Sequence, residues 1–327
     1  MRGLRVSFAV LLMIIDVSSL SAAQYSHAFL WTQTGGMQDL GTIPGYQDSY
    51  GVAINQLGEI VGEVVTPGSH AVAWHWTEAG GMQPLSGMEG LYCSPTAVNN
   101  SGAVAGNCYS TRTRGFFWTP SRGIQDIGSL GGDYTNVTGM NRSGEIVGDS
   151  NTADGSDHAF LWTQATGMQD LGVLPGAPVS YSQAYAISDT GYIVGRSLGK
   201  DGFDAAVLWK AGMIKVLGHG LAQGVNNAGE VVGTTYVGRI SQRPFLWTAD
   251  GGMQDLGLLA EAVTGFAQGI NNSGEVVGWD AFASGLQGAF VWTPTGGLQN
   301  IGTLGGSEAR AVAINDAGQV TGFSTTP

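Results

Sequence analysis

Seven short apolar segments that each end in tryptophan recur along this chain of 327 residues. The tryptophans are Trp31, Trp76, Trp118, Trp162, Trp209, Trp247 and Trp292, and the steps between them are 45, 42, 44, 47, 38 and 45 residues. A repeat of this length that contains several short strands is typical of the blades of a β-propeller. The chain is therefore predicted to be a tandem array of one β-structured unit.

Each repeat divides into four strand-like segments separated by turns. In one cycle we expect strands at 51–55, 59–64, 71–77 and 82–85, with a variable loop at 66–69. The 54 glycines and the 12% of charged residues fit a turn-rich β protein. Four antiparallel strands make one blade, so seven repeats predict an all-β fold, a seven-bladed β-propeller.

The turn between the first two strands is the most regular part of the repeat. Asparagine stands three residues before a glycine at Asn55, Asn99, Asn141, Asn226, Asn271 and Asn315, and Ser188 takes this place in the remaining repeat. The spacing is typical of a type I turn that leads into a left-handed glycine. Two positions earlier every repeat has alanine or glycine. Because blades converge on the propeller axis, this strand is predicted to be the innermost one.

The two ends of the array carry complementary halves of a repeat. The third and fourth strands come first, at 27–40, and the innermost pair comes last, at 310–323. We expect these halves to pair in one blade, which closes the ring and removes exposed sheet edges. A β-solenoid is the alternative architecture, but an open array would need capping elements that are not evident in the sequence.

Residues 1–23 precede the repeats and have the features of a secretory signal peptide. Two arginines are followed by an apolar run at 6–15 and by small residues at 21–23, and the run is too short to span a bilayer. We expect a single domain at 24–327, secreted to the extracellular space or periplasm, monomeric and without a membrane span. The net charge of −12 argues against nucleic acid as a partner.

Cys93 and Cys108 are the only cysteines, and they flank two predicted strands that meet at a turn. Folding this hairpin about its centre places the two cysteines opposite one another, whereas a one-residue bulge at Gly102 would make them diagonal neighbours. Both arrangements are within reach of a disulfide. Since the chain is expected to be exported, we predict that the pair is oxidised.

Several motifs recur in a fixed order along the chain. The segment HAFLWT occurs at 27–32 and 158–163, and the series continues with GGMQDLG at 35–41, GSLGG at 128–132 and AINDAGQVTG at 313–322. In these motifs the chain resembles the HAF family of probable extracellular repeat proteins, over essentially all of the mature chain. The resemblance implies export and a repeat fold, and it implies no known reaction.

Most residues with chemical potential have a structural explanation. The seven tryptophans share one position in the repeat, which favours packing between blades over ligand stacking. The fourth strand ends in a carboxylate in four repeats, where a surface or turn-bonding role is sufficient: Asp39, Asp126, Asp170 and Asp255.

The sequence gives little indication of a metal site. The five histidines have no close spacing to one another or to carboxylates, so we expect them to be exposed or hydrogen-bonded: His27, His70, His75, His158 and His219. The acidic loops at 154–157 and 201–204 could hold Ca²⁺, but neither has the spacing of an EF-hand. We therefore expect no metal and no cofactor, with calcium as the alternative.

The most variable position lies seven residues before the turn residue, in the connector that leads into each blade. It is occupied by Asp48, Tyr92, Tyr134, Tyr181, His219, Thr264 and Glu308. A propeller would place these residues in a ring near the mouth of the central channel, and variation on a rigid scaffold is typical of binding sites. Ordinary loop packing is the alternative explanation.

Two functions remain open from the sequence. We favour an exported, non-catalytic binding propeller whose connector face takes an extracellular glycan or protein, because no nucleophile, base and orienting group occur in a recognisable arrangement. The alternative is an extracellular polysaccharide hydrolase or lyase that uses Asp48 and Glu308 as its acid/base pair.

Overall fold

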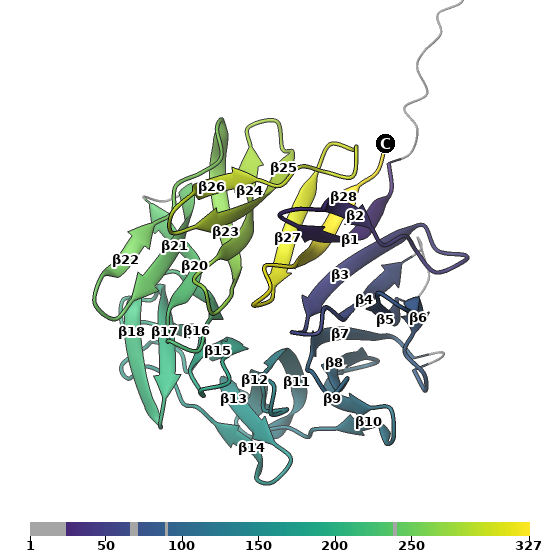
Figure 1. Cartoon of the computed structure of the whole chain (residues 1–327). Helices are drawn as coiled ribbons and strands as arrows, with labels where there is room; N and C mark the ends of the chain where they lie inside the picture. The colour runs from purple at the N-terminus through teal and green to yellow at the C-terminus, as the bar shows by residue number, and fades with distance from the viewer. Residues whose placement is uncertain (1–23, 66–70, 89–90, 238–240) are drawn as a thin grey trace, which may run out of the picture.

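The chain forms a closed ring of β-sheets (Figure 1). The computed structural model describes residues 24–65, 71–88, 91–237 and 241–327, so the predicted signal peptide at 1–23 and the predicted loop at 66–69 lie outside the described residues. Seven four-stranded antiparallel sheets surround a central axis. The prediction of a seven-bladed β-propeller is confirmed. Among the described residues no helix is long and apolar enough to cross a membrane.

The blades are numbered 1 to 7 from the first complete one, and each has four strands. From blade 1 to blade 7, the innermost strands are β3 (Asp48–Ile54), β7 (Cys93–Val98), β11 (Gly131–Met140), β15 (Ser182–Ile187), β19 (Leu221–Val225), β23 (Ala262–Ile270) and β27 (Ala309–Ile314). The second strands are β4 (Ile60–Val65), β8 (Val104–Tyr109), β12 (Ile146–Thr152), β16 (Ile193–Leu198), β20 (Val231–Val237), β24 (Val276–Phe282) and β28 (Val320–Thr325).

The third strands carry the repeated tryptophans, and the fourth strands form the outer edge. The third strands are β5 (Val72–Thr77), β9 (Thr113–Thr119), β13 (Asp157–Thr163), β17 (Asp204–Lys210), β21 (Ser241–Thr248), β25 (Gln287–Thr293) and β1 (Ser26–Thr32). The outer strands are β6 (Gly81–Pro84), β10 (Gly123–Asp126), β14 (Gly167–Asp170), β18 (Met213–His219), β22 (Gly252–Asp255), β26 (Gly297–Asn300) and β2 (Gly36–Asp39). In blade 1 these strands match the four predicted segments, except that β3 begins three residues earlier than expected.

Blade 7 is built from both ends of the chain, as predicted. The strand order in this sheet is β2-β1-β28-β27, and Figure 1 shows the purple β1 beside the yellow β28. Six residue pairs align the two strands, from Ser26↔Thr325 to Trp31↔Val320. The hydroxyl of Thr321 also donates a hydrogen bond to the carbonyl of Phe29, at 2.9 Å. Backbone pairing therefore closes the ring.

The tryptophans pack in the core between blades, which confirms their predicted role. All but Trp292 are less than a tenth exposed, and Trp292 still packs against a core cluster. Trp31 of blade 7, for example, shares a cluster with Val277 and Val291 of blade 6. Adjacent blades thus bury apolar side chains between them, and burial of apolar surface is the dominant favourable term in folding.

Small residues on the innermost strands allow neighbouring blades to approach closely, as the sequence predicts. A Cβ atom placed on Gly224 would lie 3.1 Å from the carbonyl oxygen of Gln268 and 3.3 Å from the Cα of Gly269 in the next blade. A larger side chain would therefore push adjacent innermost strands apart.

Each innermost hairpin contains a one-residue irregularity that the sequence analysis did not place. In blade 2 the register shifts between Pro95 and Ala97, and the same shift recurs at the equivalent place in all seven blades. On the second strand, the residue paired with the one just before the bulge is glycine in every blade. On Gly148, a Cβ atom would lie 1.9 Å from the carbonyl oxygen of Asn136, so no other residue fits. The β-bulge and its glycine are therefore features of the repeat.

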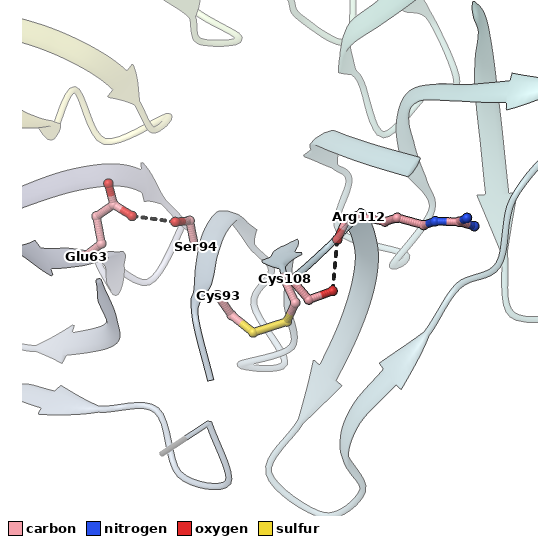
Figure 2. Close-up of a disulfide and its surroundings, with 6 residues drawn as sticks. Glu63, Cys93, Ser94, Cys108 and Arg112 are labelled. Atoms are coloured by element: carbon pink, nitrogen blue, oxygen red, sulfur yellow. Dashed lines mark hydrogen bonds between the residues drawn. A yellow bond between two sulfur atoms is a disulfide. The ribbon is translucent and has the colours of Figure 1, made fainter. Parts of the chain in front are cut away.

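The predicted disulfide is present between Cys93 and Cys108, and Figure 2 shows it joining the two strands. The cysteines are directly opposite one another in register, with Cα atoms 4.0 Å apart. The bulge that was considered at Gly102 lies instead at Thr96, inside the loop that the disulfide closes.

One connector departs from the others. Asn226 follows Trp209 by 17 residues, whereas the turn residue follows the tryptophan by 23 to 26 residues in the other repeats. Because the connector is short, β18 continues for seven residues, while every other outer strand has four. His219, which was predicted to lie in a connector, is the last residue of this strand.

Candidate functional site

The central channel has a turn end, at the turns between the first two strands of each blade, and a connector end, at the segments that lead from one blade into the next. At the turn end, asparagine side chains form a ring of hydrogen bonds, the Asn belt. In blade 6 the Oδ1 atom of Asn271 accepts hydrogen bonds from the backbone N–H groups of Ser273 and Glu275, both at 3.0 Å. Its Nδ2 atom donates to the Glu275 carboxylate at 2.6 Å and to the carbonyl of Asn315 in blade 7 at 3.1 Å. The asparagine therefore fixes its own turn and binds the next blade, a link that the sequence analysis missed.

The same link to the next blade recurs around the ring. It joins Asn55 to Asn99, Asn99 to Arg142, Asn141 to Ser188, Asn226 to Asn271, and Asn315 to Asn55. In blade 4, where Ser188 replaces asparagine, the Thr190 hydroxyl donates to the carbonyl of Asn227 instead.

The residues that follow the turn asparagines meet around a cavity of about 220 Å³ at this end. Arg142 pairs with Asp189 of the adjacent blade, Nε to Oδ2 at 3.2 Å, and with Asp316 of blade 7, Nη2 to Oδ2 at 3.0 Å. The Asn272 amide donates to the same oxygen of Asp316 at 2.9 Å. The charged side chains of Arg142, Asp189 and Asp316 at the turn end therefore form ion pairs with one another.

Toward the connector end the channel widens into a cavity of about 610 Å³. One residue from every blade lines it, always the bulge residue directly before the small residue: Val52, Thr96, Thr138, Tyr185, Gln223, Gln268 and Val312. Asn107, Tyr109, Asn136, Val137 and Leu221 complete the lining. This ring could have been predicted from the sequence. The position directly before the small residue of the innermost strand varies between repeats, and such variation indicates side chains that do not pack in the repeated core.

None of the seven residues predicted as a binding ring lines this cavity. They lie farther toward the connectors: Asp48 begins β3, Tyr134 and Thr264 lie within β11 and β23, and His219 ends β18. Tyr92, Tyr181 and Glu308 directly precede β7, β15 and β27. Their role in binding stays a prediction.

One of the predicted tyrosines, Tyr92, contacts a tyrosine that lines the cavity. The rings of Tyr92 and Tyr109 have centroids 5.0 Å apart, and Tyr109 lines the cavity. Burial, followed by the charges of Asp149 and neighbouring groups that include Tyr109 and Tyr181, raises the pKa of Tyr134 to about 12. Blades 2, 3 and 4 therefore present a cluster of tyrosines on one side of the channel.

The predicted acid/base pair consists of Asp48 in blade 1 and Glu308 beside blade 7. The carboxylate of Asp48 accepts a hydrogen bond from the backbone N–H of Ser26 in blade 7, at 2.8 Å. Among the described residues no hydrogen bond joins the two carboxylates. His219 lies 3.7 Å from a carboxylate oxygen of Asp201, on the surface.

A buried polar network lies beside the tyrosines. Asp149 is fully buried, and its Oδ1 atom accepts a hydrogen bond from Asn136 at 3.0 Å, while Oδ2 has no partner. Burial raises the pKa of Asp149 to about 6. In the next blade the guanidinium of Arg196 binds Asp204, Gln183 and the hydroxyl of Tyr181. A polar, hydrogen-bonded network therefore lies beside the cavity, and Asn136 is its member that lines the cavity.

These residues belong to a level of cross-strand pairs that differ in every blade. Each pair joins the innermost and second strands two residues before the bulge residue: Tyr50–Glu63, Ser94–Asn107, Asn136–Asp149, Gln183–Arg196, Leu221–Thr234, Phe266–Trp279 and Arg310–Phe323. Figure 2 shows one contact from this level to the next blade, the hydrogen bond from Ser94 to Glu63.

The other candidates from the sequence have structural contacts. The fourth-strand carboxylates accept a hydrogen bond from the glycine N–H two residues later, as in Asp39 to Gly41 at 2.7 Å, which confirms a turn-bonding role. His27 pairs with Asp39 and His158 with Asp170, at 2.9 and 2.8 Å.

The remaining histidines and acidic loops give no ligand cluster. His75 lies 3.8 Å from Glu59, and burial lowers its pKa. His70 lies outside the described residues. The Asp154 carboxylate binds the hydroxyl of Thr152 and the N–H of Ser156 within its own turn. No group of three His, Cys, Asp or Glu side chains in the described part of the chain is placed to hold a metal ion.

The comparisons with known proteins concern the fold. No family model matches the chain, and no curated protein is similar to it in sequence. Among solved structures, a putative TolB from Agrobacterium tumefaciens is similar over 94% of this chain and 100% of its own, with 12% identity and a TM-score of 0.56. At this identity the likeness shows a shared propeller fold.

Peptidase structures share the same fold over part of their length. A puromycin-hydrolyzing peptidase from Mycobacterium tuberculosis matches with 11% identity and a TM-score of 0.58, over 82% of this chain and 47% of its own. A prolyl endopeptidase matches with 14% identity and a TM-score of 0.57, over 82% of this chain and 45% of its own. The chain therefore spans about half the length of these peptidases, and 62% of a TolB from Acinetobacter baumannii.

Proposed function

We propose that this chain is an exported binding propeller with a non-catalytic ligand site in the channel, entered from the connector end. One observation carries the proposal: every blade contributes a side chain to a cavity of about 610 Å³, and these seven side chains are of four types while the scaffold around them repeats. Concave sites lined by aromatic and polar side chains on a rigid scaffold are typical of ligand binding.

The two ends of the channel differ in their capacity for a ligand. At the turn end, the side chains of Arg142, Asp189 and Asp316 already bind one another. At the connector end, Tyr109, Tyr185, Gln223 and Gln268 line the larger cavity. Tyrosine faces and side-chain amides suit the hydroxyl and apolar surfaces of a glycan, and they also suit a peptide.

Export is supported by the disulfide between Cys93 and Cys108, since disulfides persist in oxidising compartments. The resemblance to the HAF family of probable extracellular repeat proteins and the predicted signal peptide at 1–23 are consistent with this proposal. We propose no reaction in this cavity.

The experiment is a screen of the purified protein on glycan arrays, together with capture of partners from the extracellular medium. Tyr185→Ala, in the cavity, is expected to weaken binding of any ligand found by at least tenfold. Tyr236→Ala is the matched control, because Tyr236 is exposed at the end of β20 and does not line the cavity. Equal loss in both variants, or in neither, would contradict a ligand site in the cavity.

A second variant tests the wider ring predicted from the sequence. Simultaneous replacement of Tyr92, Tyr134 and Tyr181 by alanine removes the connector tyrosines and leaves the bulge residues in place. Binding that survives this change would confine the ligand to the cavity itself.

A further inference from the structure

A serine, a histidine and an aspartate form a chain of hydrogen bonds at the junction of blades 3 and 4. The Nε2 atom of His158, near the start of β13, lies 2.7 Å from the Oγ atom of Ser180 in the connector to blade 4. Its Nδ1 atom lies 2.8 Å from Oδ2 of Asp170, the last residue of β14. The Oδ1 atom of Asp170 accepts a hydrogen bond from the N–H of Gly172 at 2.7 Å. The order of the three side chains, and the ring nitrogen that each partner contacts, are those of a serine hydrolase triad.

The histidine–aspartate half of this chain belongs to the repeat. Four blades pair a basic residue four positions before the tryptophan with the carboxylate of the outer strand: His27–Asp39, Arg114–Asp126, His158–Asp170 and Arg243–Asp255. Arginine forms such a pair but stays protonated, so it cannot act as a base. Histidine can both take up and release a proton near neutral pH. The pairs in blades 3 and 7 therefore have a chemical capacity that the two arginine pairs lack.

The serine distinguishes the pair in blade 3 from the pair in blade 7. The connector position eight residues before the turn residue is Ser180 at the junction of blades 3 and 4, but Gln47 at the junction of blades 7 and 1. This position also holds a serine before blade 7, Ser307, but there the residue that corresponds to His158 is Gly288. Within the part of the chain that the structure describes, the complete triad therefore occurs at one junction.

The triad is open to solvent and is arranged for proton transfer. A carboxylate only accepts hydrogen bonds, so Nδ1 of His158 carries the ring proton and Nε2 accepts from the serine hydroxyl. The side chains of His158 and Asp170 are 15% and 42% exposed, and Ser180 is partly buried. Val179, the residue before the serine, is well exposed. A substrate can therefore reach the serine from the connector face.

The two backbone segments that carry the histidine and the serine are fixed beside one another. Asp157 and Tyr181, their direct neighbours in sequence, form a parallel β-bridge. One residue further along each segment, the N–H of Ala159 donates to the hydroxyl of the buried Ser182 at 2.9 Å. Since the protein holds the base and the hydroxyl in place before a substrate arrives, little orientational entropy is lost in the reaction.

We propose that Ser180 is the nucleophile of an esterase site, with His158 as its general base and Asp170 as the residue that positions the histidine. This inference goes beyond the proposed function, because Ser180 lines neither of the cavities described above. The substrate class is a carboxylic ester, whose alkoxide leaves more readily than the amine of an amide. A short acyl group is expected, since a long one would need an apolar pocket and neither cavity adjoins the serine.

The reaction has two steps, and water is the co-reactant. The Oγ atom of Ser180 attacks the carbonyl carbon while Nε2 of His158 takes its proton. The bond from this carbon to the alcohol oxygen then breaks, and the imidazolium gives the proton to the leaving alcohol. In the second step water attacks the acyl-serine with His158 as base, which releases the carboxylic acid and returns a proton to Oγ. Asp170 stays ionised and stabilises the imidazolium.

The test is covalent labelling of the purified protein with a fluorophosphonate, which reacts with activated serines, followed by peptide mass spectrometry. The label is expected on Ser180. Ser180→Ala should abolish it, and His158→Gln should slow it by at least about 100-fold, the contribution of a general base. His27→Gln is the matched control, because it breaks an equivalent histidine–aspartate pair that has no serine, and it should be labelled like wild type.

The role of Asp170 is tested by turnover of p-nitrophenyl acetate. Asp170→Asn should lower kcat by at least about 100-fold and leave KM unchanged, because the histidine then adopts the wrong tautomer. Asp39→Asn removes the corresponding carboxylate of blade 7 and should change neither constant. An aspartate with a purely structural role would lower the melting temperature in both variants and leave kcat the same.

Mapping the label uses wild-type protein, so it decides the question even if the variants fail to fold. Wild-type protein that carries no label on Ser180, or that hydrolyses p-nitrophenyl acetate no faster than Ser180→Ala does, would overturn the esterase site. Equal loss of labelling in His158→Gln and His27→Gln would also overturn it, because both would then act through stability. Faster hydrolysis of the decanoate than of the acetate would overturn the short acyl group. Ligand binding in the cavity is decided separately by the array screen.

Discussion

The turn end and the connector end of the channel are made from the same strands, yet they use their polar residues differently. At the turn end, six blades carry the same asparagine, and its amide joins each turn to the next blade. At the connector end, the cross-strand pairs differ in all seven blades, from Asn136–Asp149 to Phe266–Trp279. The repeated asparagines have their hydrogen bonds satisfied within the ring, whereas the variable pairs include a polar atom without a hydrogen-bond partner, Oδ2 of Asp149.

This contrast separates stability from binding. A side chain whose bonds are all internal contributes to folding and offers little to a ligand. A buried polar group that lacks a partner lowers stability, and such groups persist where function requires them. Substitutions of the turn asparagines should therefore lower the free energy of unfolding, whereas replacing an unpartnered buried polar group at the connector end should raise it.

The largest effect is expected from removing the strands that close the ring, which both ends of the channel require. Deletion of residues 311–327 removes β28 and most of β27. Strand β1 then loses β28 and pairs only with β2, so blade 7 cannot form. Stability should fall globally, because every blade packs against two neighbours. Thermal unfolding followed by circular dichroism measures this. A melting temperature and cooperativity equal to wild type would show that the paired ends do not stabilise the ring.

The second prediction concerns the disulfide, which supports the connector end of blade 2. There the pair Ser94–Asn107 is polar and supplies little apolar packing. Replacing Cys93 and Cys108 by serine should lower the free energy of unfolding by about 3 kcal/mol, because the unfolded chain regains the entropy of a short loop. Urea denaturation of the oxidised protein and the double variant checks this. An unchanged midpoint would mean that the blade does not depend on the bond.

The third prediction uses the buried carboxyl of Asp149. Its folded pKa of about 6 lies above the ordinary value of 3.8, so the fold favours the protonated form. The stabilisation from protonation is complete below pH 3.8 and is lost as the pH rises through 6. Asp149→Asn should therefore be more stable than wild type at pH 8, by on the order of 2 to 3 kcal/mol. The difference should shrink toward zero at pH 3.5.

Urea denaturation of both proteins across this pH range is the measurement. A variant that is less stable than wild type at pH 8 would show that the carboxylate at this connector-end position stabilises the fold, and the contrast between the two ends would fail there.

The smallest effect is expected for Asn271→Ser at the turn end, which copies the natural Ser188 of blade 4. Serine keeps an acceptor for the turn, as Ser188 does for Tyr192, but loses the bond to Asn315 of the next blade. It also loses the bond to the Glu275 carboxylate, but that group is only half-buried and can exchange the amide for water. The cost should be about 1 kcal/mol, the net value of one hydrogen bond. Asn271→Ala should cost about 2 kcal/mol, because turn N–H groups also lose their acceptor. Equal costs for serine and alanine would mean that the turn acceptor contributes nothing, and an Asn271→Ser variant as stable as wild type would mean that the link between blades contributes nothing.

The repeated features were predictable because repetition multiplies a weak signal. The spacing of the tryptophans, the asparagine turns and the small residues predicted seven blades, the innermost strand and the closure of blade 7. The Asn belt was missed because the type I turn explains each asparagine locally, and only the ring geometry brings Asn271 within reach of Asn315.

The candidate site was less predictable because it depends on where side chains point. The variable connector position was identified, but the bulge rotates a different residue, such as Tyr185 or Gln268, into the cavity. Bulges leave little trace in a single repeat, although the glycine opposite each one, such as Gly148, recurs in all seven. The guanidinium carbon of Arg310 lies 4.2 Å from the ring centroid of Trp279 in the neighbouring blade, a contact that could not be predicted from the sequence because the two residues belong to different repeats.

The pairing of β1 with β28 also sets the order of events during synthesis. The hydrogen bond from Thr321 to Phe29 spans 292 residues, so the first strand of the ring waits for almost the last one to be made. Contacts this far apart in sequence form slowly, and until they form both strands present unpaired edges. A nascent chain can thus complete six blades and remain open at the seventh. Protection of that open edge before release is a requirement that the topology places on any cell that makes this protein.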